Sequence, residues 1–299
     1  MRVTVRVPAT VANLGPGFDI LALAVQLQNE VVASSEAEGG VSIDPGPGAP
    51  EELRNPGQNL IARAFLAACE AAGVEPPPVA LRCRNAIPFS RGLGSSAAAS
   101  LSGVLAANAL AGLGWDAQQV IDRAAELEGH PDNVSAAMLG GLAICVRGSP
   151  AVQVPVPEEL RAVLFIPDGE MSTSAARRVV PLTFSREDAI HNAARCALLV
   201  TAMLTGQLDL LGEAMRDRWH QPARADLMPH LPIVIDAALA AGAHGACLAG
   251  AGPSVLALCS GDAEAVGEAM AEAARSLPVP GRPVVHAIRN FGARVDLAP

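Results

Sequence analysis

The segment Arg91-Gly-Leu-Gly-Ser-Ser-Ala97 lies between a strand-like stretch, residues 79–87, and an uncharged helical stretch, residues 97–112. Its two glycines allow the backbone to turn sharply and to approach a ligand closely. The amides at the start of the following helix attract an anion, and the two serine hydroxyls can bind a phosphate oxygen or a magnesium ion. A glycine turn followed by a serine N-cap explains the same residues without any ligand.

A dinucleotide-binding loop is a second interpretation of this segment. From residue 92 the sequence matches the pattern GxGxxA, and Asp116 follows at about the distance at which that fold places an acidic residue. In such a loop the first glycine directly follows its strand, whereas residues 88–91 intervene here. Asp116 stands in a helix-cap context rather than at a strand end. On this segment alone both interpretations stay open, with dinucleotide binding the weaker of the two.

Two further segments contain residues suited to phosphoryl transfer. Residues 126–133 (ELEGHPDN) hold three carboxylates, a histidine and an amide, and residues 245–254 (GACLAGAGPS) form a second glycine-rich loop. Phosphoryl transfer needs Mg²⁺, which proteins hold through one or two carboxylates together with the substrate phosphates. A charged helix end broken by glycine and proline is the plainer explanation of the first segment, so neither segment decides the function alone.

The composition excludes several mechanisms and partners. The chain has 299 residues, is 51% hydrophobic and 17% charged, and contains neither lysine nor tyrosine. A Schiff-base lysine, a phosphate-binding Walker lysine and a tyrosine general acid are therefore ruled out. The net charge is −9, and the arginines are scattered among the carboxylates. Because a nucleic-acid groove needs a basic stripe, we expect no nucleic-acid partner.

Neither a membrane span nor a secretory signal is expected. The N-terminus alternates like a strand and lacks the apolar run of a signal peptide. Residues 92–115 carry no charge and approach the length of a span, but five glycines, four serines and an asparagine favour a buried helix. The six cysteines show neither CxxC nor zinc spacing. We therefore expect a reduced, cytoplasmic protein without a membrane partner.

The remaining patterns predict an α+β protein of two domains, divided at the proline-punctuated stretch 150–157 into residues 1–155 and 156–299. In the first domain, strands are predicted at 2–8, 22–34, 79–87 and 141–146, and helices at 60–72, 97–112 and 116–127. In the second, strands are predicted at 161–166, 246–258 and 283–289, and helices at 186–205, 207–219, 231–241 and 262–276.

Taken together, four segments resemble the motifs of the homoserine kinase family, within the superfamily of galacto-, homoserine, mevalonate and phosphomevalonate (GHMP) kinases. They are residues 8–19 (PATVANLGPGFD), 87–98 (IPFSRGLGSSAA), 128–134 (EGHPDNV) and 248–254 (LAGAGPS). The second motif is shared by the superfamily, whereas the first and third are specific to homoserine kinases. Val11 and Ser90 depart from the family pattern at positions without an obvious role. The resemblance implies a GHMP-kinase-like fold, with an N-terminal nucleotide-binding α/β domain, a C-terminal ferredoxin-like domain and the site between them.

The resemblance also implies roles for individual residues. ATP would contact Asn59, Pro88, Arg91, Gly92, Leu93, Gly94, Ser95, Ser96 and Ala97. Mg²⁺ would be held by Ser96 and by Glu128, which belongs to the motif proper and is preferred over Glu126. Homoserine would contact Asn13, Asp19, His130, Asp132, Arg177 and Arg224. Asp132 and His130 are also candidates for receiving the hydroxyl proton, and Asn133 for orienting the γ-phosphate.

The implied activity is transfer of the ATP γ-phosphoryl group to the hydroxyl of L-homoserine, giving O-phospho-L-homoserine for threonine biosynthesis. A guanidinium fork binds a carboxylate through two hydrogen bonds, which suits Arg177 and Arg224 to a zwitterionic amino acid. One alternative is a GHMP kinase that acts on another small hydroxy compound. Another, from a different class, is a non-catalytic relative or a dinucleotide-binding protein. A homodimer stays open.

Overall fold

A long β-hairpin begins the chain and forms the centre of the first sheet. β1 (Arg2–Asn13) pairs antiparallel with β2 (Gly17–Ser34), and the glycine- and proline-containing residues 14–16 make the turn. Alternate residues of β1, such as Val3 and Val5, are fully buried, because successive side chains of a strand point to opposite faces. The computed structural model describes residues 1–35, 39–277 and 279–298.

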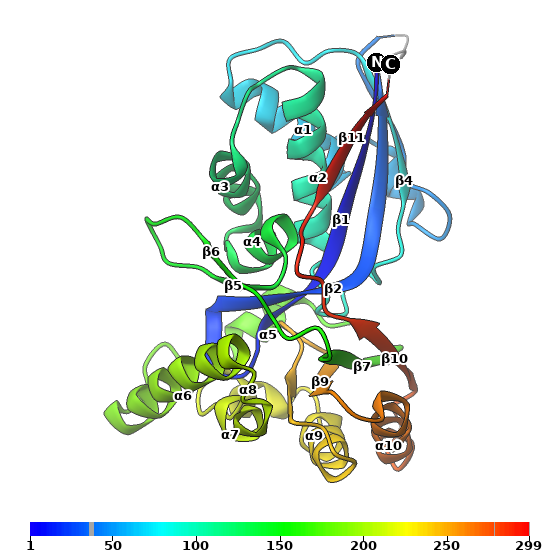
Figure 1. Ribbon diagram of the computed structural model, residues 1–299. Helices are drawn as coiled ribbons and strands as arrows, with labels where there is room; N and C mark the ends of the chain where they lie inside the picture. Colours follow the sequence, from blue (N-terminus) through cyan, green and yellow to red (C-terminus); the bar gives the residue numbers. More distant parts are fainter. Residues whose placement is uncertain (36–38, 278, 299) are drawn as a thin grey trace.

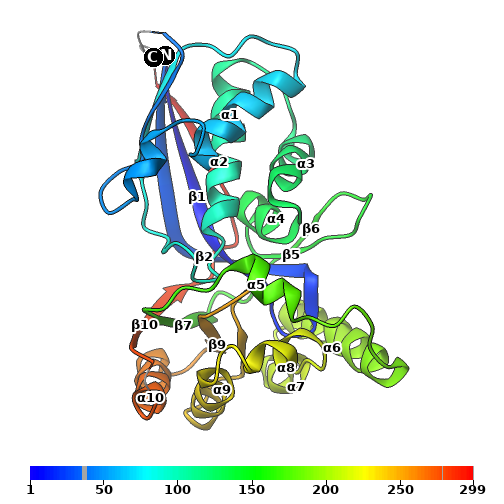
Figure 2. The same cartoon turned by 180° about the vertical axis from the view of Figure 1, so that it is seen from behind.

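The first sheet has seven strands, in the order β11-β1-β2-β4-β3, with β5 on β2 and β6 on β5. These strands are β3 (Val41–Asp44), β4 (Val79–Arg84), β5 (Leu142–Ile144), β6 (Val152–Val154) and β11 (Arg294–Ala298). Helices α1 (Leu60–Ala71), α2 (Ser95–Leu110), α3 (Ala117–Glu128) and α4 (Asp132–Leu139) cover one face (Figures 1 and 2). The short 3-10 helix η1 (Glu51–Arg54) precedes α1.

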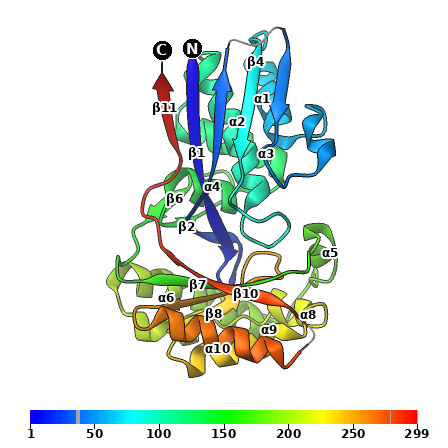
Figure 3. The same cartoon turned by 90° about the vertical axis from the view of Figure 1, so that its right-hand side faces the viewer.

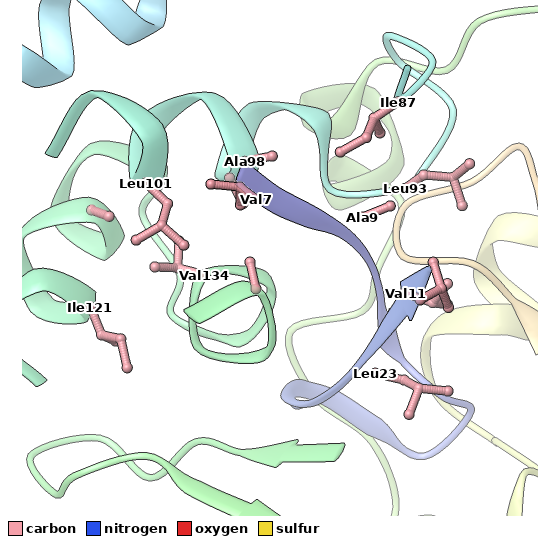
Figure 4. Packing of buried hydrophobic residues seen from close by; sticks show 14 of the residues in the cluster. Val7, Ala9, Val11, Leu23, Ile87, Leu93, Ala98, Leu101, Ile121 and Val134 are labelled. Carbon is pink, nitrogen blue, oxygen red and sulfur yellow. The ribbon is translucent and has the colours of Figure 1, made fainter. Parts of the chain in front are cut away.

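Helix α2 is the buried centre of this layer, as its uncharged sequence predicts. Leu101 and Val104 are fully buried, and Gly103 lies so close to α1 that a Cβ there would meet the Ile61 carbonyl oxygen at 2.2 Å. Figure 4 shows Ala98 and Leu101 of α2 near Val7 of β1 and Val134 of α4. In the described part of the chain, no helix combines the length and the apolar character that crossing a bilayer requires.

The second sheet has the ferredoxin-like order that the family resemblance implies. Its strands are β7 (Arg161–Pro167), β8 (Gly245–Leu248), β9 (Val255–Cys259) and β10 (Gly281–Ala287), ordered β10-β7-β9-β8 with all neighbours antiparallel. Helices α9 (His230–Ala240) and α10 (Ala263–Arg275) complete a βαββαβ unit and pack on one face of the sheet (Figure 3). The fold is thus a two-sheet α+β fold, as predicted.

A helical insertion separates β7 from α9. It contains α5 (Thr173–Arg178), α6 (Arg186–Thr205), η2 (Leu208–Leu210), α7 (Leu211–Ala214) and α8 (His220–Ala225). The single helix predicted at 207–219 is only partly correct, because the helical path ends at Ala214. Beyond it, the buried carboxylate of Asp217 accepts hydrogen bonds from the backbone N–H groups of Trp219 and Gln221 at the start of α8.

The end of the chain returns to the first sheet. β11 pairs antiparallel with β1, so that Ala298 lies opposite Arg2 and the two termini lie together in Figure 1. The sequence patterns had not predicted this strand, and they had placed its residues in the second domain. The predicted boundary near residue 155 falls between β6 and β7, and it stays a prediction.

Candidate active site

A cavity of about 430 Å³ lies at the junction between the layer of the first sheet and that of the second. Residues from all four sequence motifs line it. Helix α5 lies at this junction in Figure 2. The cavity is lined by all the sequence-predicted site residues except Ala97, which is fully buried, and Glu126. Segments that are far apart in the chain therefore line the same cavity.

The glycine–serine loop is held close to its neighbours at both glycines. A Cβ on Gly92 would meet the Ala249 carbonyl oxygen at 2.1 Å, and one on Gly94 would meet Thr10 Oγ1 at 2.1 Å. Both glycines have positive φ, 77° and 69°. Residues of two other motifs thus press against the loop and fix its path.

The start of α2 is left without a side-chain cap. Its N-cap is Gly94 in a left-handed conformation, with no side-chain hydrogen bond to the first turn. The interpretation of this segment as an ordinary serine-capped turn is therefore wrong, since Ser95 is the first residue of the helix itself. First-turn amides without a protein partner favour an anion.

The dinucleotide-loop alternative also fails on geometry. β4 ends at Arg84, well before Gly92, whereas a dinucleotide loop leaves its strand directly. Asp116 is the N-cap of α3, where its carboxylate and the side chain of Gln119 form a capping box. The carboxylate of Asp116 therefore caps a helix, whereas in a dinucleotide-binding fold the acidic residue would bind a ribose hydroxyl.

Glu128 faces the loop from the end of α3. Its two carboxylate oxygens accept hydrogen bonds from Ser96 Oγ and Ser100 Oγ, each at 2.7 Å. Glu126 is different, because its carboxylate pairs with Arg123 at 2.5 Å on the surface, outside the residues that line the cavity. Of the two carboxylates, only that of Glu128 shares the cavity with the loop.

The start of α4 carries a compact polar cluster. Asp132 is buried, and its Oδ1 accepts hydrogen bonds from the Asn133 backbone N–H and from His130 Nδ1, both at 2.7 Å. Thr10 Oγ1 donates to Asn133 Oδ1 at 2.8 Å, and the Thr10 N–H donates to the Leu93 carbonyl. Thr10 therefore connects this cluster to the glycine–serine loop.

Asp19 and Arg177 form a bidentate ion pair at the cavity wall. Their hydrogen bonds measure 2.7 and 2.9 Å. Asn13 organises the turn that carries Asp19, since its Oδ1 accepts from the Asp19 N–H and its Nδ2 donates to the Gly250 carbonyl. Asn13 and Asp19 both adopt positive φ, 74° and 59°, which residues other than glycine adopt rarely. The hydrogen bonds of Asn13 and these backbone conformations thus fix the shape of the hairpin turn at the cavity wall.

Arg224 is a buried cation that pairs with no carboxylate among the residues that the structure describes. Its side chain is 1% exposed, and Nε and Nη1 donate to the Ala176 and Gly250 carbonyls at 3.0 Å. The second Nη1 hydrogen points to His220 Nδ1 at 3.2 Å, and in the described structure neither Nη2 hydrogen has a protein acceptor. Burial, and then the nearby Arg177, lower the pKa of Arg224 to about 10, so the group stays charged at neutral pH. A buried charge of this kind is stabilised by an anionic ligand.

Comparison with known proteins agrees with this architecture. Residues 59–141 match the GHMP kinases N terminal domain and residues 199–276 match the GHMP kinases C terminal domain. A homoserine kinase of Synechococcus sp. is 42% identical over 301 residues, covering 99% of this chain and 98% of the relative. One of Desulfitobacterium hafniense is 39% identical over 299 residues, covering 98% and 99%. This chain belongs to the homoserine kinase family of GHMP kinases.

Solved structures support the same placement. The crystal structure of a homoserine kinase from Cytophaga hutchinsonii superposes with a TM-score of 0.88 at 30% identity, covering 99% of this chain and 97% of the other. A mevalonate kinase at 16% identity and a TM-score of 0.70 shares the fold alone. Membership in this kinase family gives ATP as the phosphoryl donor and a small molecule as the acceptor.

Two residues expected to contact the nucleotide, Arg91 and Asn59, also have protein partners. Arg91 donates from Nε to the Pro167 carbonyl at 2.9 Å and from Nη2 to the Asp168 carbonyl at 2.5 Å. Asn59 caps α1 by accepting the Ile61 N–H, and its Nδ2 donates to a backbone carbonyl. Both residues line the cavity, so their contact with ATP stays a prediction, but the contacts present anchor the surrounding chain.

Sequence reasoning missed Thr10 and His220. Thr10 lies within the first motif, but only the folded hairpin shows that its hydroxyl reaches Asn133. His220 lies outside the four sequence motifs, and it is fully buried beside Arg224. The spacing of His220 and Arg224, four residues apart on one helix, was the available signal.

The hydrogen bond that His130 donates to Asp132, with a smaller contribution from the charge of Asp132, raises the pKa of His130. We expect Asp132→Asn to lower the pKa of His130 toward its ordinary range, as measured by NMR titration of the ring. Because the pKa is raised in the folded state, the pair stabilises the wild type fully below the ordinary pKa of about 6.5. This contribution should disappear as the pH rises through the raised pKa. An unchanged His130 titration in Asp132→Asn would contradict the assigned pair.

Proposed function

We propose that this chain transfers the γ-phosphoryl group of ATP to the side-chain hydroxyl of L-homoserine, giving O-phospho-L-homoserine and ADP. The observation that carries the proposal is the buried guanidinium of Arg224, whose Nη2 has no protein acceptor in the described structure. It lines the same cavity as the glycine–serine loop, so a carboxylate and a phosphate chain are both accommodated. The similar proteins from Synechococcus and Desulfitobacterium are named homoserine kinases, which supports this acceptor.

The residues around the loop suit phosphate and Mg²⁺. The uncapped first turn of α2 would donate backbone hydrogen bonds to the ATP phosphates. Glu128 and Ser96 supply one carboxylate and one hydroxyl, a donor set that fits Mg²⁺ completed by substrate phosphates and water. We place the ion on these two residues rather than on Glu126. When bound, the ion would neutralise charge on the transferred group.

The cluster at α4 would face the reacting groups. Asn133 uses Oδ1 for the Thr10 hydroxyl, which turns its NH₂ group toward other acceptors, and we assign that group to the γ-phosphate. Asp132 uses Oδ1 for His130 and for the Asn133 N–H. We assign its second oxygen to the substrate hydroxyl, whose proton it can hold as the phosphoryl group transfers. Positioning and charge neutralisation supply most of the catalysis in this class of reaction.

The amino-acid end of the substrate would meet Asp19, Arg177 and Arg224. The carboxylate would bind Arg224 Nη2 and share Arg177, and the ammonium group would bind Asp19. In the structure Asp19 and Arg177 pair with each other, so a zwitterion offers each of them a group of the required sign. A sugar or an isoprenoid alcohol offers no such pair of charges.

Arg224→Leu is expected to raise KM for homoserine about 10- to 150-fold, because it removes a charge-assisted contact of roughly 1.5–3 kcal/mol. KM for ATP should barely change, since the nucleotide lies beyond the transferred phosphate. Arg224→Lys should restore the homoserine KM only in part, because an ammonium group lacks the planar fork. Steady-state kinetics with each substrate varied in turn measures these effects.

The matched control is aminopropanol, which is homoserine without its carboxylate. It should be a poor substrate of the wild type and should lose little more when Arg224 is replaced. An equal loss of activity toward both compounds would make Arg224 a structural residue. The alternative function, phosphorylation of another small hydroxy compound by the same GHMP machinery, would then regain weight.

A further inference from the structure

His220 is a buried histidine that the proposed reaction has not used so far. It is the first residue of α8, its side chain is 0% exposed, and it lies one helical turn before Arg224. Nε2 lies 2.7 Å from the Gly15 carbonyl oxygen, and Nδ1 lies 3.2 Å from Arg224 Nη1. The imidazole therefore connects the hairpin turn of the first motif to the buried guanidinium.

The neighbours of the ring fix its tautomer. A carbonyl oxygen can only accept a hydrogen bond and a guanidinium N–H can only donate one. Nε2 must therefore carry the proton that goes to Gly15, and Nδ1 must offer a lone pair to Arg224. Burial lowers the pKa of His220 to about 4 and outweighs the opposing charge of Asp217, whose Oδ2 lies 3.4 Å from Nε2. The charge of Arg224 adds to the lowering, and the result agrees with a neutral ring.

The contact with His220 completes the fixation of the guanidinium. The other two acceptors on Arg224 are backbone carbonyls, those of Ala176 at the Nε end and Gly250 at Nη1. These three hydrogen bonds orient the planar group and leave Nη2 as its only end without a protein acceptor among the described residues. Among these three acceptors of Arg224, His220 is the single side chain. Its lone pair therefore helps to determine which nitrogen of the guanidinium stays available to a ligand.

We propose that neutral His220 is a positioning residue for carboxylate recognition: its Nδ1 lone pair holds Arg224 so that Nη2 can bind the carboxylate of the amino-acid substrate. This inference rests on the proposed function, because it assigns the carboxylate of homoserine to Arg224. A purely structural role, in which the ring fills space beside Phe18 and binds the Gly15 carbonyl, is the competing explanation.

Two amide substitutions separate these roles, because each reproduces one nitrogen of the ring. In His220→Asn the amide lies near the place of Nδ1, so it can still accept from Arg224 but cannot reach Gly15. In His220→Gln the amide lies near the place of Nε2, so it can still donate to Gly15 but offers Arg224 no acceptor. The two variants therefore exchange which of the two contacts survives.

The kinetic expectation follows from this exchange. His220→Gln should raise KM for homoserine about tenfold, the effect of losing one hydrogen bond to a charged group. His220→Asn should stay close to wild type in this constant, even though its melting temperature falls more. KM for ATP and turnover of aminopropanol should be similar in both variants. In an Arg224→Leu background, the change from His220 to Gln should add nothing to the homoserine KM.

Three results would overturn the inference. One is a homoserine KM in His220→Gln equal to that in His220→Asn, and another is a full additional effect in the Arg224→Leu background. The third needs no variant: a nitrogen NMR spectrum of the wild type in which His220 carries its proton on Nδ1. If the wild type itself fails to phosphorylate homoserine, the proposed function fails, whereas normal wild-type activity with any of these results removes only the role of His220.

Discussion

A Gly94→Val variant is expected to lose measurable ATP binding. Gly94 has a φ of 69°, a conformation that a β-branched residue resists. A Cβ at this position would meet Thr10 Oγ1 at 2.1 Å and Asn133 Oδ1 at 3.3 Å, so the side chain would force apart the hydrogen bond that joins these two residues. The first turn of α2 would then move away from the phosphates it is proposed to bind.

Isothermal titration calorimetry with Mg·ATP measures this loss. Gly112→Val is the matched control, because Gly112 has a similar φ of 65° but a Cβ there would meet no atom within 4 Å. The control carries the same kind of backbone strain without the collision, and it should bind ATP like the wild type. Normal ATP affinity in Gly94→Val would show that the loop does not approach the nucleotide.

Glu128→Gln is expected to reduce turnover about 100-fold or more, an effect typical of removing one electrostatic partner from a reacting centre. The amide keeps the size of the carboxylate and can still accept a hydrogen bond from Ser96 or Ser100, so the melting temperature should be preserved. The variant loses the negative charge of the carboxylate, which we propose binds Mg²⁺. The deficit should therefore appear in kcat and in the apparent affinity for Mg²⁺.

Glu126→Gln is the control, since it lies two residues away on the same helix and pairs with Arg123 outside the cavity. It should retain near-normal activity. The opposite pattern, with Glu126→Gln inactive and Glu128→Gln active, would show that the wrong carboxylate is assigned to the metal.

Much of the fold could be predicted because its signals are local. Helix α2 follows from an uncharged stretch behind two glycines, and the capping residues Asp116 and Asn59 mark the starts of α3 and α1. The predicted helix 207–219 ends early, at Ala214, and the buried carboxylate of Asp217 binds the backbone N–H groups of Trp219 and Gln221 beyond it. Asn192, a residue distant in sequence, donates a hydrogen bond to the same carboxylate, and this contact leaves no local signal.

Strand β11 shows a second limit of predicting the fold from the sequence. Its residues alternate between polar and apolar side chains (RVDLA), but the strand is only five residues long and exposed throughout, and it is held by its backbone pairing with β1. A strand that is fixed mainly by a distant partner leaves little trace in its own sequence. The short helix α4 was not predicted either, since the glycine and proline of the polar motif at its start indicate the break of a helix end.

The candidate site, like the fold, could be predicted only in part. The residue sets came from motif resemblance, and the cavity brings together all of them but Ala97 and Glu126. The resemblance could not show that Asp19 and Arg177 pair with each other, that Arg91 is bound to backbone carbonyls, or that His220 faces Arg224. These contacts join elements that lie far apart in the chain, and they exist only once both sheets have formed.

The central claim is that this chain phosphorylates homoserine, and one assay tests it most directly. The purified protein is incubated with ATP, Mg²⁺ and each of several hydroxy compounds in turn: homoserine, aminopropanol, a hexose and mevalonate. Phosphorus NMR and mass spectrometry identify the product. We predict O-phosphohomoserine as the product with by far the highest kcat/KM, and a weak reaction with aminopropanol. Equal or faster phosphorylation of the hexose or of mevalonate, or no ATP-dependent product from homoserine, would contradict the account.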